Sequence, residues 1–147
     1  MKIAIASDHA AFAMKGELAA WLEGLGHEVA DLGPADGGTS VDYPDYGYRL
    51  AAHVAAGRAD FGVAACGSGI GISIAVNRNP AVRCALVSEP LSAALAREHN
   101  DANVIALGAR LIGVEMAKAC IAAFLATPFG GERHVRRVAK LSAPPAG

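Results

Sequence analysis

Short apolar runs alternate with longer segments of helical periodicity along this chain, and this alternation limits the possible folds more than any other feature. Runs such as Ile3–Ala6 and Val82–Val87 do not alternate polar with apolar residues, as expected for strands that are buried on both faces. Strands that alternate with helices form a parallel sheet with helices packed on both sides. The sequence therefore predicts an α/β fold, a three-layer α/β/α sandwich around a Rossmann-like, five-stranded parallel sheet.

The predicted elements follow one another in a regular order. Strands are expected at 2–7, 28–32, 61–65, 82–87 and 104–107. Helices are expected at 12–25, 43–56, from a glycine-rich turn to about Asn77, at 91–98, at 114–125 and, as a short last helix, at 132–139. Ser88 is the predicted cap of the helix at 91–98, with Pro90 near its first turn. With 147 residues, no repeat and no long linker, we expect one domain over 1–147 with a frayed tail at 142–147.

Composition and charge exclude several classes of protein. The net charge is −1, whereas nucleic-acid binders usually carry a basic excess. No uncharged apolar run reaches the ~18 residues of a membrane span, and the N-terminus lacks the pattern of a signal peptide. Three cysteines without a Cys-x-x-Cys pair favour a reducing compartment. We expect a cytoplasmic protein that has neither nucleic acid nor membrane as a partner.

The predicted sheet indicates where a ligand would bind. In open parallel sheets, ligands lie beyond the carboxyl ends of the strands. In this chain those positions hold Asp8 and His9, the loop Cys66–Gly71, Ser88–Pro90 and Arg110.

The loop Cys66–Gly71 is the most informative of these segments, because three glycines alternate where a strand meets a helix. Such a loop can direct backbone N–H groups at an anion, although a tight structural turn explains a Gly-x-Gly-x-Gly pattern about as well. The loop has neither the Walker pattern nor the Gly-x-Gly-x-x-Gly fingerprint. Cys66 stands where a helix dipole lowers a thiol pKa, while Cys84 and Cys120 are interpreted as buried hydrophobes.

The remaining polar residues have structural alternatives of comparable weight. Asp8-His9 suits a turn or cap, and His99 alone would suit a surface position. Arg133 and Arg137 are four residues apart on one predicted helix face, which suits a phosphate monoester, and Arg110 could join them. No two histidines have a metal-ligand spacing such as His-x3-His, so we expect no metal.

Taken together, these segments resemble the ribose-5-phosphate isomerase B family, which includes galactose-6-phosphate and allose-6-phosphate isomerases. Seven matches occur in the order of the family and extend from residue 2 to about 140. They are Ile5–Ala10, Asp42-Tyr43-Pro44, Cys66–Ala75, Ser88-Glu89-Pro90, Arg97–Val104, Gly108-Ala109-Arg110 and Arg133-His134.

The resemblance implies an aldose–ketose isomerase that acts on a sugar phosphate without metal or cofactor. Cys66 would carry the proton between neighbouring carbons, with the Ser68 hydroxyl beside it, and His99 would assist ring opening with Asp8 as its helper. The sugar and the enediolate would be held by Asp8, His9, Asn100 and the loop residues Gly67, Ser68, Gly69, Ile70 and Gly71. The phosphate would be bound by Arg110, Arg133 and Arg137. Family members form dimers or dimers of dimers with shared sites, so part of the group from His99 to Arg110 would come from a neighbouring chain.

Several alternatives remain open at this point. The same chemistry could serve a tetrose phosphate of the erythrose-4-phosphate type, or a hexose phosphate such as allose 6-phosphate or galactose 6-phosphate. Tyr43, Tyr46 and the loop 33–40 are plausible walls of the pocket that would decide this. A non-catalytic sugar-phosphate sensor and a Cys–His hydrolase with a covalent intermediate are the alternatives from other classes.

Overall fold

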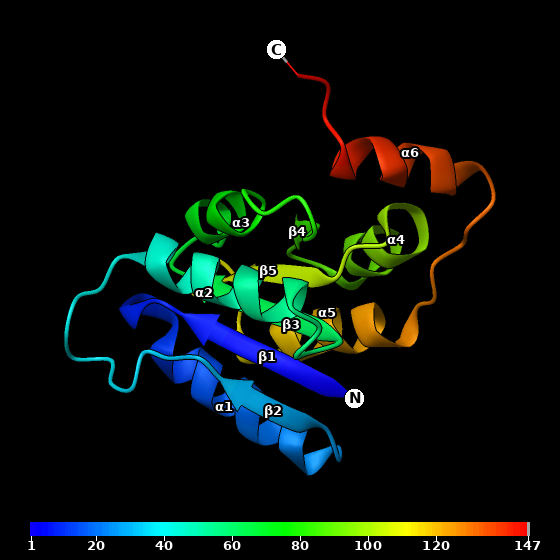
Figure 1. Ribbon diagram of the computed structural model, residues 1–147. Coiled ribbons are helices and arrows are strands. Elements are labelled where there is room, and N and C mark those ends of the chain that lie inside the picture. Colours follow the sequence, from blue (N-terminus) through cyan, green and yellow to red (C-terminus); the bar gives the residue numbers. More distant parts are fainter. Residues whose placement is uncertain (147) are drawn as a thin grey trace.

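The computed structural model describes residues 1–146 as a parallel sheet with helices on both faces (Figure 1). The strands are β1 (Lys2–Ser7), β2 (Glu28–Asp31), β3 (Phe61–Cys66), β4 (Cys84–Leu86) and β5 (Val104–Gly108). The helices are the short 3-10 helix η1 (His9–Ala11) and the α-helices α1 (Phe12–Gly24), α2 (Tyr43–Ala55), α3 (Ile70–Val76), α4 (Pro90–Asn100), α5 (Val114–Ala126) and α6 (Arg133–Ser142). The predicted three-layer α/β/α architecture is confirmed.

All five strands are parallel, in the order β2-β1-β3-β5-β4. The sequence predicts the strands but not this order, in which β5 lies between β3 and β4. The register aligns Ser7 with Ala65 and Cys66 with Gly108. The carboxyl ends of β1, β3 and β5 therefore lie side by side in the middle of the sheet.

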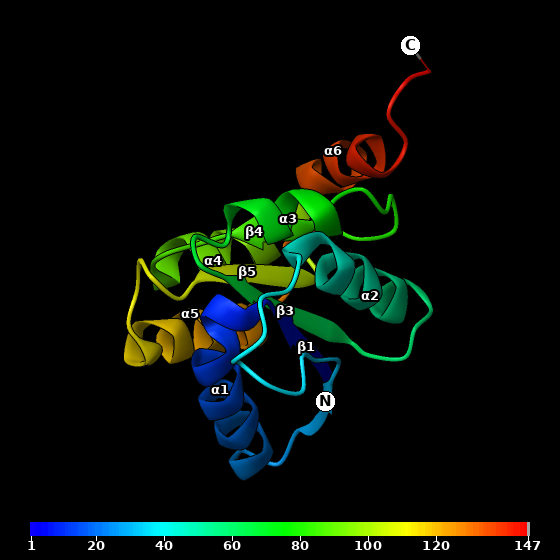
Figure 2. The same cartoon turned by 90° about the vertical axis from the view of Figure 1, so that its left-hand side faces the viewer.

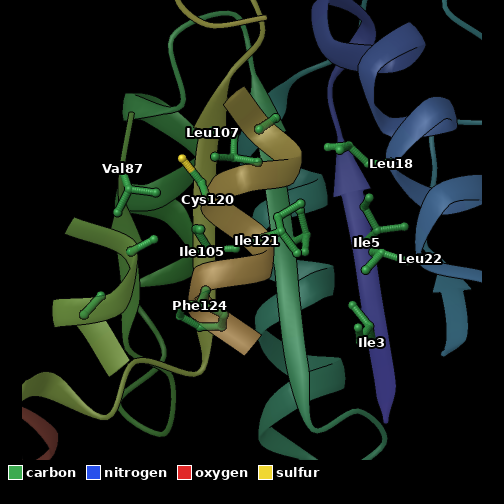
Figure 3. Close-up of a cluster of buried hydrophobic side chains, with 14 of the residues drawn as sticks. Ile3, Ile5, Leu18, Leu22, Val87, Ile105, Leu107, Cys120, Ile121 and Phe124 are labelled. Atoms are coloured by element: carbon green, nitrogen blue, oxygen red, sulfur yellow. The ribbon is translucent and has the colours of Figure 1, made fainter. Parts of the chain in front are cut away.

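The two faces of the sheet carry different side chains. Ile3, Ile5, Ile105 and Leu107 point to the face covered by α1, α4 and α5, and Figure 3 shows these side chains packed around Leu18, Leu22, Ile121 and Phe124. The alternate strand residues, which include Ala4, Ala6, Ala64 and Ala106, face α2 and α3 instead. Small side chains on this face let helices approach the sheet closely, which accounts for part of the alanine content of the chain.

The structure corrects some predicted boundaries. β4 pairs with β5 only over Cys84–Leu86, because the backbone N–H of Val82 bonds to the carbonyl of Asn79 in the preceding turn and that of Arg83 bonds to the Asn103 side chain. The predicted cap at Ser88 is wrong. Glu89 caps α4, and its carboxylate accepts hydrogen bonds from the backbone N–H of Leu91 and of Ser92 at 2.6 and 2.7 Å. The last helix extends to Ser142, the first residue of the predicted frayed tail; Gly147 lies outside the described residues.

Two leucines near the end of α1 test the core. Leu22 is fully buried, whereas Leu25 is 56% exposed. We expect Leu22→Ala to lower the free energy of unfolding by about 2–5 kcal/mol, because it leaves a cavity under the sheet. Leu25→Ala is the matched control and should change this free energy by less than about 0.5 kcal/mol. Urea unfolding followed by circular dichroism measures both, and equal effects would contradict this assignment of the core.

Candidate active site

Backbone hydrogen bonds join the loops that follow the three central strands. The N–H of Asp8 donates to the carbonyl of Ala65 at 3.2 Å, which ties the end of β1 to β3. On the other side of β3, Ala109 donates to the carbonyl of Cys66 and Arg110 donates to that of Gly67, both at 2.9 Å. The predicted residues after β1, β3 and β5 are therefore brought together at one edge of the sheet.

The turn from β3 into α3 holds the Cys66 thiol in a fixed position. Cys66 is 4% exposed, and its Sγ accepts a hydrogen bond from the backbone N–H of Gly69 at 3.1 Å. Gly69 has a φ of 76° and is the N-cap of α3, a left-handed conformation that favours glycine. Ser68 Oγ accepts from the N–H of Ile70 at 3.2 Å. The sulfur thus lies at the start of α3, within hydrogen-bond distance of a backbone N–H donor.

The other two thiols are in less polar positions. Burial raises the pKa of Cys84, on the edge strand, to about 12. Burial also raises the pKa of Cys120, in the core beneath the sheet, and the charge of Glu89 adds to this effect. Both remain protonated thiols near neutral pH, in keeping with their predicted role as small hydrophobes.

Asp8, Tyr43 and Arg110 lie next to the Cys66 turn, and His9 follows Asp8 directly. Asp8 is 7% exposed, and its Oδ1 accepts from the N–H of Ala11 at 3.2 Å, which caps η1. A Cβ atom placed on Gly71 would lie 2.5 Å from Cζ of Tyr43, and one placed on Gly67 would lie 3.4 Å from the Arg110 guanidinium. The two glycines therefore lie directly under the Tyr43 ring and the Arg110 side chain.

A second group of predicted site residues lies at the opposite side of the sheet, where the amino ends of the strands are. α4 begins beyond the carboxyl end of β4 and runs back to Asn100, so His99 and Asn100 lie near the amino ends of the strands. The N–H of Asn103 donates to the carbonyl of Arg83 before β4, and the carbonyl of Asn103 accepts from Gly62 at the start of β3. The length of β3 separates this edge from Cys66, roughly 16–20 Å at about 3.3 Å per residue. Within one chain, Asp8 and His99 do not meet.

Helix α6 adds two arginines to this second group. The rings of His99 and His134 are stacked, with centroids 4.6 Å apart and planes inclined by 13°. The N–H of Gly130, just before α6, donates to the carbonyl of Glu98 at 2.9 Å. Arg133 and Arg137 are exposed on α6, which lies beside α4 (Figure 1) and at the other end of the molecule from α1 (Figure 2). In one chain, Arg110 is therefore separated from the arginines with which it was expected to act.

The charges around His134 are mostly positive. Its pKa is lowered, first by loss of solvent around the ring, then by the charge of His99, and further by Arg133 and Arg137. Glu98 acts in the opposite direction. A neutral His134 leaves the positive charge of this surface to the arginines.

The sequence analysis missed the residues that hold His99 and Asn100 in place. Arg97 and Arg83 both bind Asp101, at 2.7 and 3.1 Å, and so fix the turn that follows Asn100. Asp101 itself has a φ of 45°. The i,i+4 spacing of Arg97 and Asp101 was the available signal. The stacking of His134 on His99 has no local signal, since the two residues are far apart in sequence.

Two further observations concern metals and membranes. Within residues 1–146, no three His, Cys, Asp or Glu side chains gather closely enough to hold a metal ion. In the same part of the chain, no helix combines the length and the apolar character needed to cross a membrane.

Comparisons with known proteins show the family to which this chain is similar. The family model for Ribose/Galactose Isomerase matches residues 3–141. Ribose-5-phosphate isomerase B of Escherichia coli is 44% identical over 142 residues, covering 97% of this chain and 95% of that protein.

Solved structures are similar over nearly the whole length. The crystal structure of a ribose 5-phosphate isomerase from Thermotoga maritima superposes with a TM-score of 0.93 at 49% identity, covering 96% of this chain and 97% of that one. Ribose-5-phosphate isomerase B from Mycoplasma genitalium, with bound ribulose-5-phosphate, gives a TM-score of 0.92 at 36% identity over 96% of this chain and 93% of that one. The chain belongs to the ribose/galactose isomerase family.

Proposed function

We propose that this protein interconverts ribose 5-phosphate and ribulose 5-phosphate by proton transfer through a cis-enediolate, with Cys66 as the base. The family is one of aldose–ketose isomerases, and the relatives from Escherichia coli and Thermotoga maritima are named for this pentose phosphate. The observation that carries the mechanism is the geometry of Cys66. Its sulfur is buried at a strand end and accepts a backbone N–H from the loop that begins α3.

The reaction needs no external oxidant or reductant. The Cys66 thiolate removes the proton from the carbon next to the aldehyde, and the electron pair moves to form the enediolate. The same thiol then returns the proton to the neighbouring carbon, while a second proton moves between the two oxygens. Preorganised N–H donors stabilise the charge that develops on such an intermediate, and the turn 66–71 is the source of donors in this site.

The separation of the two predicted groups supports a site shared between subunits. Asp8, His9, the 66–71 turn and Arg110 lie at one edge of the sheet, and His99, Asn100, Arg133 and Arg137 lie at the other. We infer that a homodimer, or a dimer of dimers, brings the second group of one subunit to the first group of another. His99 of one subunit then assists opening of the sugar ring beside Asp8 of the other. Arg133 and Arg137 join Arg110 at the phosphate.

The apolar side chains exposed in one chain support such an assembly. Ile70, Ile74, Leu86, Leu91 and Leu111 are between 44% and 67% exposed. They come from α3, the edge strand β4, α4 and the loop before α5. Exposed apolar residues from neighbouring elements are typical of surfaces that another protein covers.

The role of Cys66 can be tested by substitution. We expect Cys66→Ala to lower kcat by about 10²–10⁴-fold, the usual contribution of a positioned base, while ribulose 5-phosphate still binds. Deuterium incorporation from D₂O into the transferred carbon position should be lost in parallel. Cys84→Ala is the matched control, because that thiol lies outside the site, and it should keep wild-type turnover. Full activity in Cys66→Ala would exclude Cys66 as the base.

Shared sites make a prediction about mixed subunits. Cys66→Ala and His99→Asn homodimers should each be nearly inactive. After the two proteins are unfolded together and refolded at equal amounts, half of the dimers are mixed, and each mixed dimer contains one intact site. We expect recovery of about a quarter of wild-type activity, as two-fold symmetry requires. Activity that stays at the level of the parent variants would contradict the shared site.

The phosphate assignment predicts an effect on binding. Arg137→Ala should raise KM for ribose 5-phosphate by about tenfold or more, the effect of losing a charged hydrogen bond. Unfolding should not change, because α6 has no buried residue. Arg136→Ala is the control, since it removes the same charge from the adjacent position. An equal rise in KM for both variants would indicate a general effect of charge and would remove Arg137 from the site.

The size of the sugar is decided by a coupled assay across tetrose, pentose and hexose phosphates. A pentose 5-phosphate should show the highest kcat/KM. A higher value for a tetrose or hexose phosphate would keep the mechanism and change the substrate. If every sugar phosphate bound but none were turned over, the result would favour the alternative function, a non-catalytic sugar-phosphate sensor.

A further inference from the structure

The loop between β2 and α2, residues 32–42, lies against the beginning of α1, as the cyan segment beside the blue helix in Figure 2 shows. Three side chains at intervals of three residues contact it, namely His9, Phe12 and Lys15. All three come from η1 and the first turns of α1, and they meet the loop at Val41, Gly37 and Pro34 respectively.

Lys15 fixes the first part of the loop. This lysine is only 2% exposed, and its Nζ donates to both carboxylate oxygens of Asp31 at 2.6 Å and to the carbonyl of Pro34 at 3.1 Å. A buried ammonium group needs such partners, because removal from water is otherwise very unfavourable. The end of β2 and the start of the loop are therefore tied to α1.

Gly37 fixes the middle of the loop by close packing. A Cβ atom at this position would lie 2.8 Å from Cδ1 and 3.0 Å from Cβ of Phe12, closer than carbon atoms approach. The next residue, Gly38, has space, since its Cβ would meet only Oδ1 of Asp36 at 3.7 Å. That oxygen also accepts the N–H groups of Gly38 and Thr39, at 3.0 Å each, so the loop has its own internal turn.

Val41 connects the loop to the candidate site. Its backbone N–H donates to Nδ1 of His9 at 3.1 Å. An imidazole nitrogen that accepts a hydrogen bond carries no hydrogen, so the hydrogen of the neutral ring is on Nε2. His9 follows Asp8, whose own N–H is bound to the carbonyl of Ala65 beside Cys66.

We propose that loop 32–42 is a positioning element for His9: Val41, held in place through Lys15 and Phe12, fixes the imidazole with its hydrogen on Nε2, so that His9 donates to an oxygen of the sugar. This rests on the proposed function for the identity of the sugar. The tautomer itself depends only on contacts within the chain. Lys15, Gly37 and Val41 are positioning residues, since none of them needs to contact substrate.

The tautomer is measured directly by long-range ¹H–¹⁵N correlation spectra of the histidine rings, at a pH where His9 is neutral. The His9 signals are identified by their loss in His9→Gln. We expect the wild-type protein to show hydrogen on Nε2 and a bare Nδ1. Gly37→Ala displaces the loop from Phe12 and should give a mixture of tautomers, with kcat/KM lower by about five- to tenfold, as for one lost hydrogen bond. Gly38→Ala, the matched control, should keep both the wild-type tautomer and the wild-type kcat/KM.

Two additional variants separate positioning from general damage. Lys15→Met removes the contact with Pro34 and should give the same mixture of His9 tautomers as Gly37→Ala. Lys15→Arg keeps a positive charge at this position, so most of its His9 rings should carry the hydrogen on Nε2, as in the wild type. Phe12→Ala added to Gly37→Ala makes room for the new methyl group and should also return the Nε2–H form.

Three results would overturn the proposal. They are a wild-type His9 with hydrogen on Nδ1, a wild-type mixture of tautomers, and an unchanged tautomer in Gly37→Ala despite lost activity. The first two need no variant to fold. If the tautomer is fixed as expected but no sugar phosphate is isomerised, the proposed function fails and the positioning of His9 stands.

Discussion

The close contact between the Cys66 turn and β5 is the constraint on which the rest of the site depends. A Cβ atom on Gly108 would lie 2.5 Å from the carbonyl oxygen of Ser68, and one on Gly69 would lie 2.8 Å from the carbonyl carbon of Leu107. The turn can therefore rest directly on the neighbouring strand only because both positions are glycine. This contact orients the N–H of Gly69 toward the sulfur and lets the backbone of residues 109–110 bond to Cys66 and Gly67. Cys66 and Arg110 consequently belong to one rigid unit.

The parallel topology explains why one chain holds only part of the predicted site. In a parallel sheet each connecting helix must return the chain to the opposite edge, so residues at the end of a helix lie far from residues at the end of a strand. Cys66 ends β3, and His99 lies in the last turn of α4. No change of loop conformation brings them together, because both are held by regular hydrogen bonding. The shared site proposed above would use both groups without disturbing the fold.

The sequence predicts much of the fold because its signals are local. Periodicity, glycine positions and Pro90 locate five strands and six helices to within a few residues. Their order in the sheet depends on contacts that are distant in sequence. Neither periodicity nor spacing indicates that β5 lies between β3 and β4. β4 begins later than its apolar run because the backbone N–H groups of Val82 and Arg83 bond to Asn79 and to the Asn103 side chain. Glu89, not Ser88, directly precedes α4, and its carboxylate accepts from two N–H groups.

For the candidate site, the same division between local and distant contacts holds. The residues after each strand could be listed from the sequence, and the structure gathers those of β1, β3 and β5. Lys15 and Val41 escaped notice, as did the contact of His134 with His99, because their importance depends on partners that lie elsewhere in the sequence. Lys15 in particular follows the pattern of an ordinary helix-surface lysine, and only the folded chain shows that its ammonium group is buried against Asp31 and Pro34.

Helix α6 shows how phosphate binding and assembly are connected under the proposed function. None of its residues is buried in one chain, and its contacts with α4 centre on the stacked rings of His99 and His134. Helices of about ten residues are marginal without packing partners, so much of the stability of α6 must come from other contacts, and its exposed Val135 and Leu141 are suited to make them. A neighbouring subunit that covers α6 would order Arg133 and Arg137 at the same time. Assembly and the ability to hold a phosphate would then depend on the same helix.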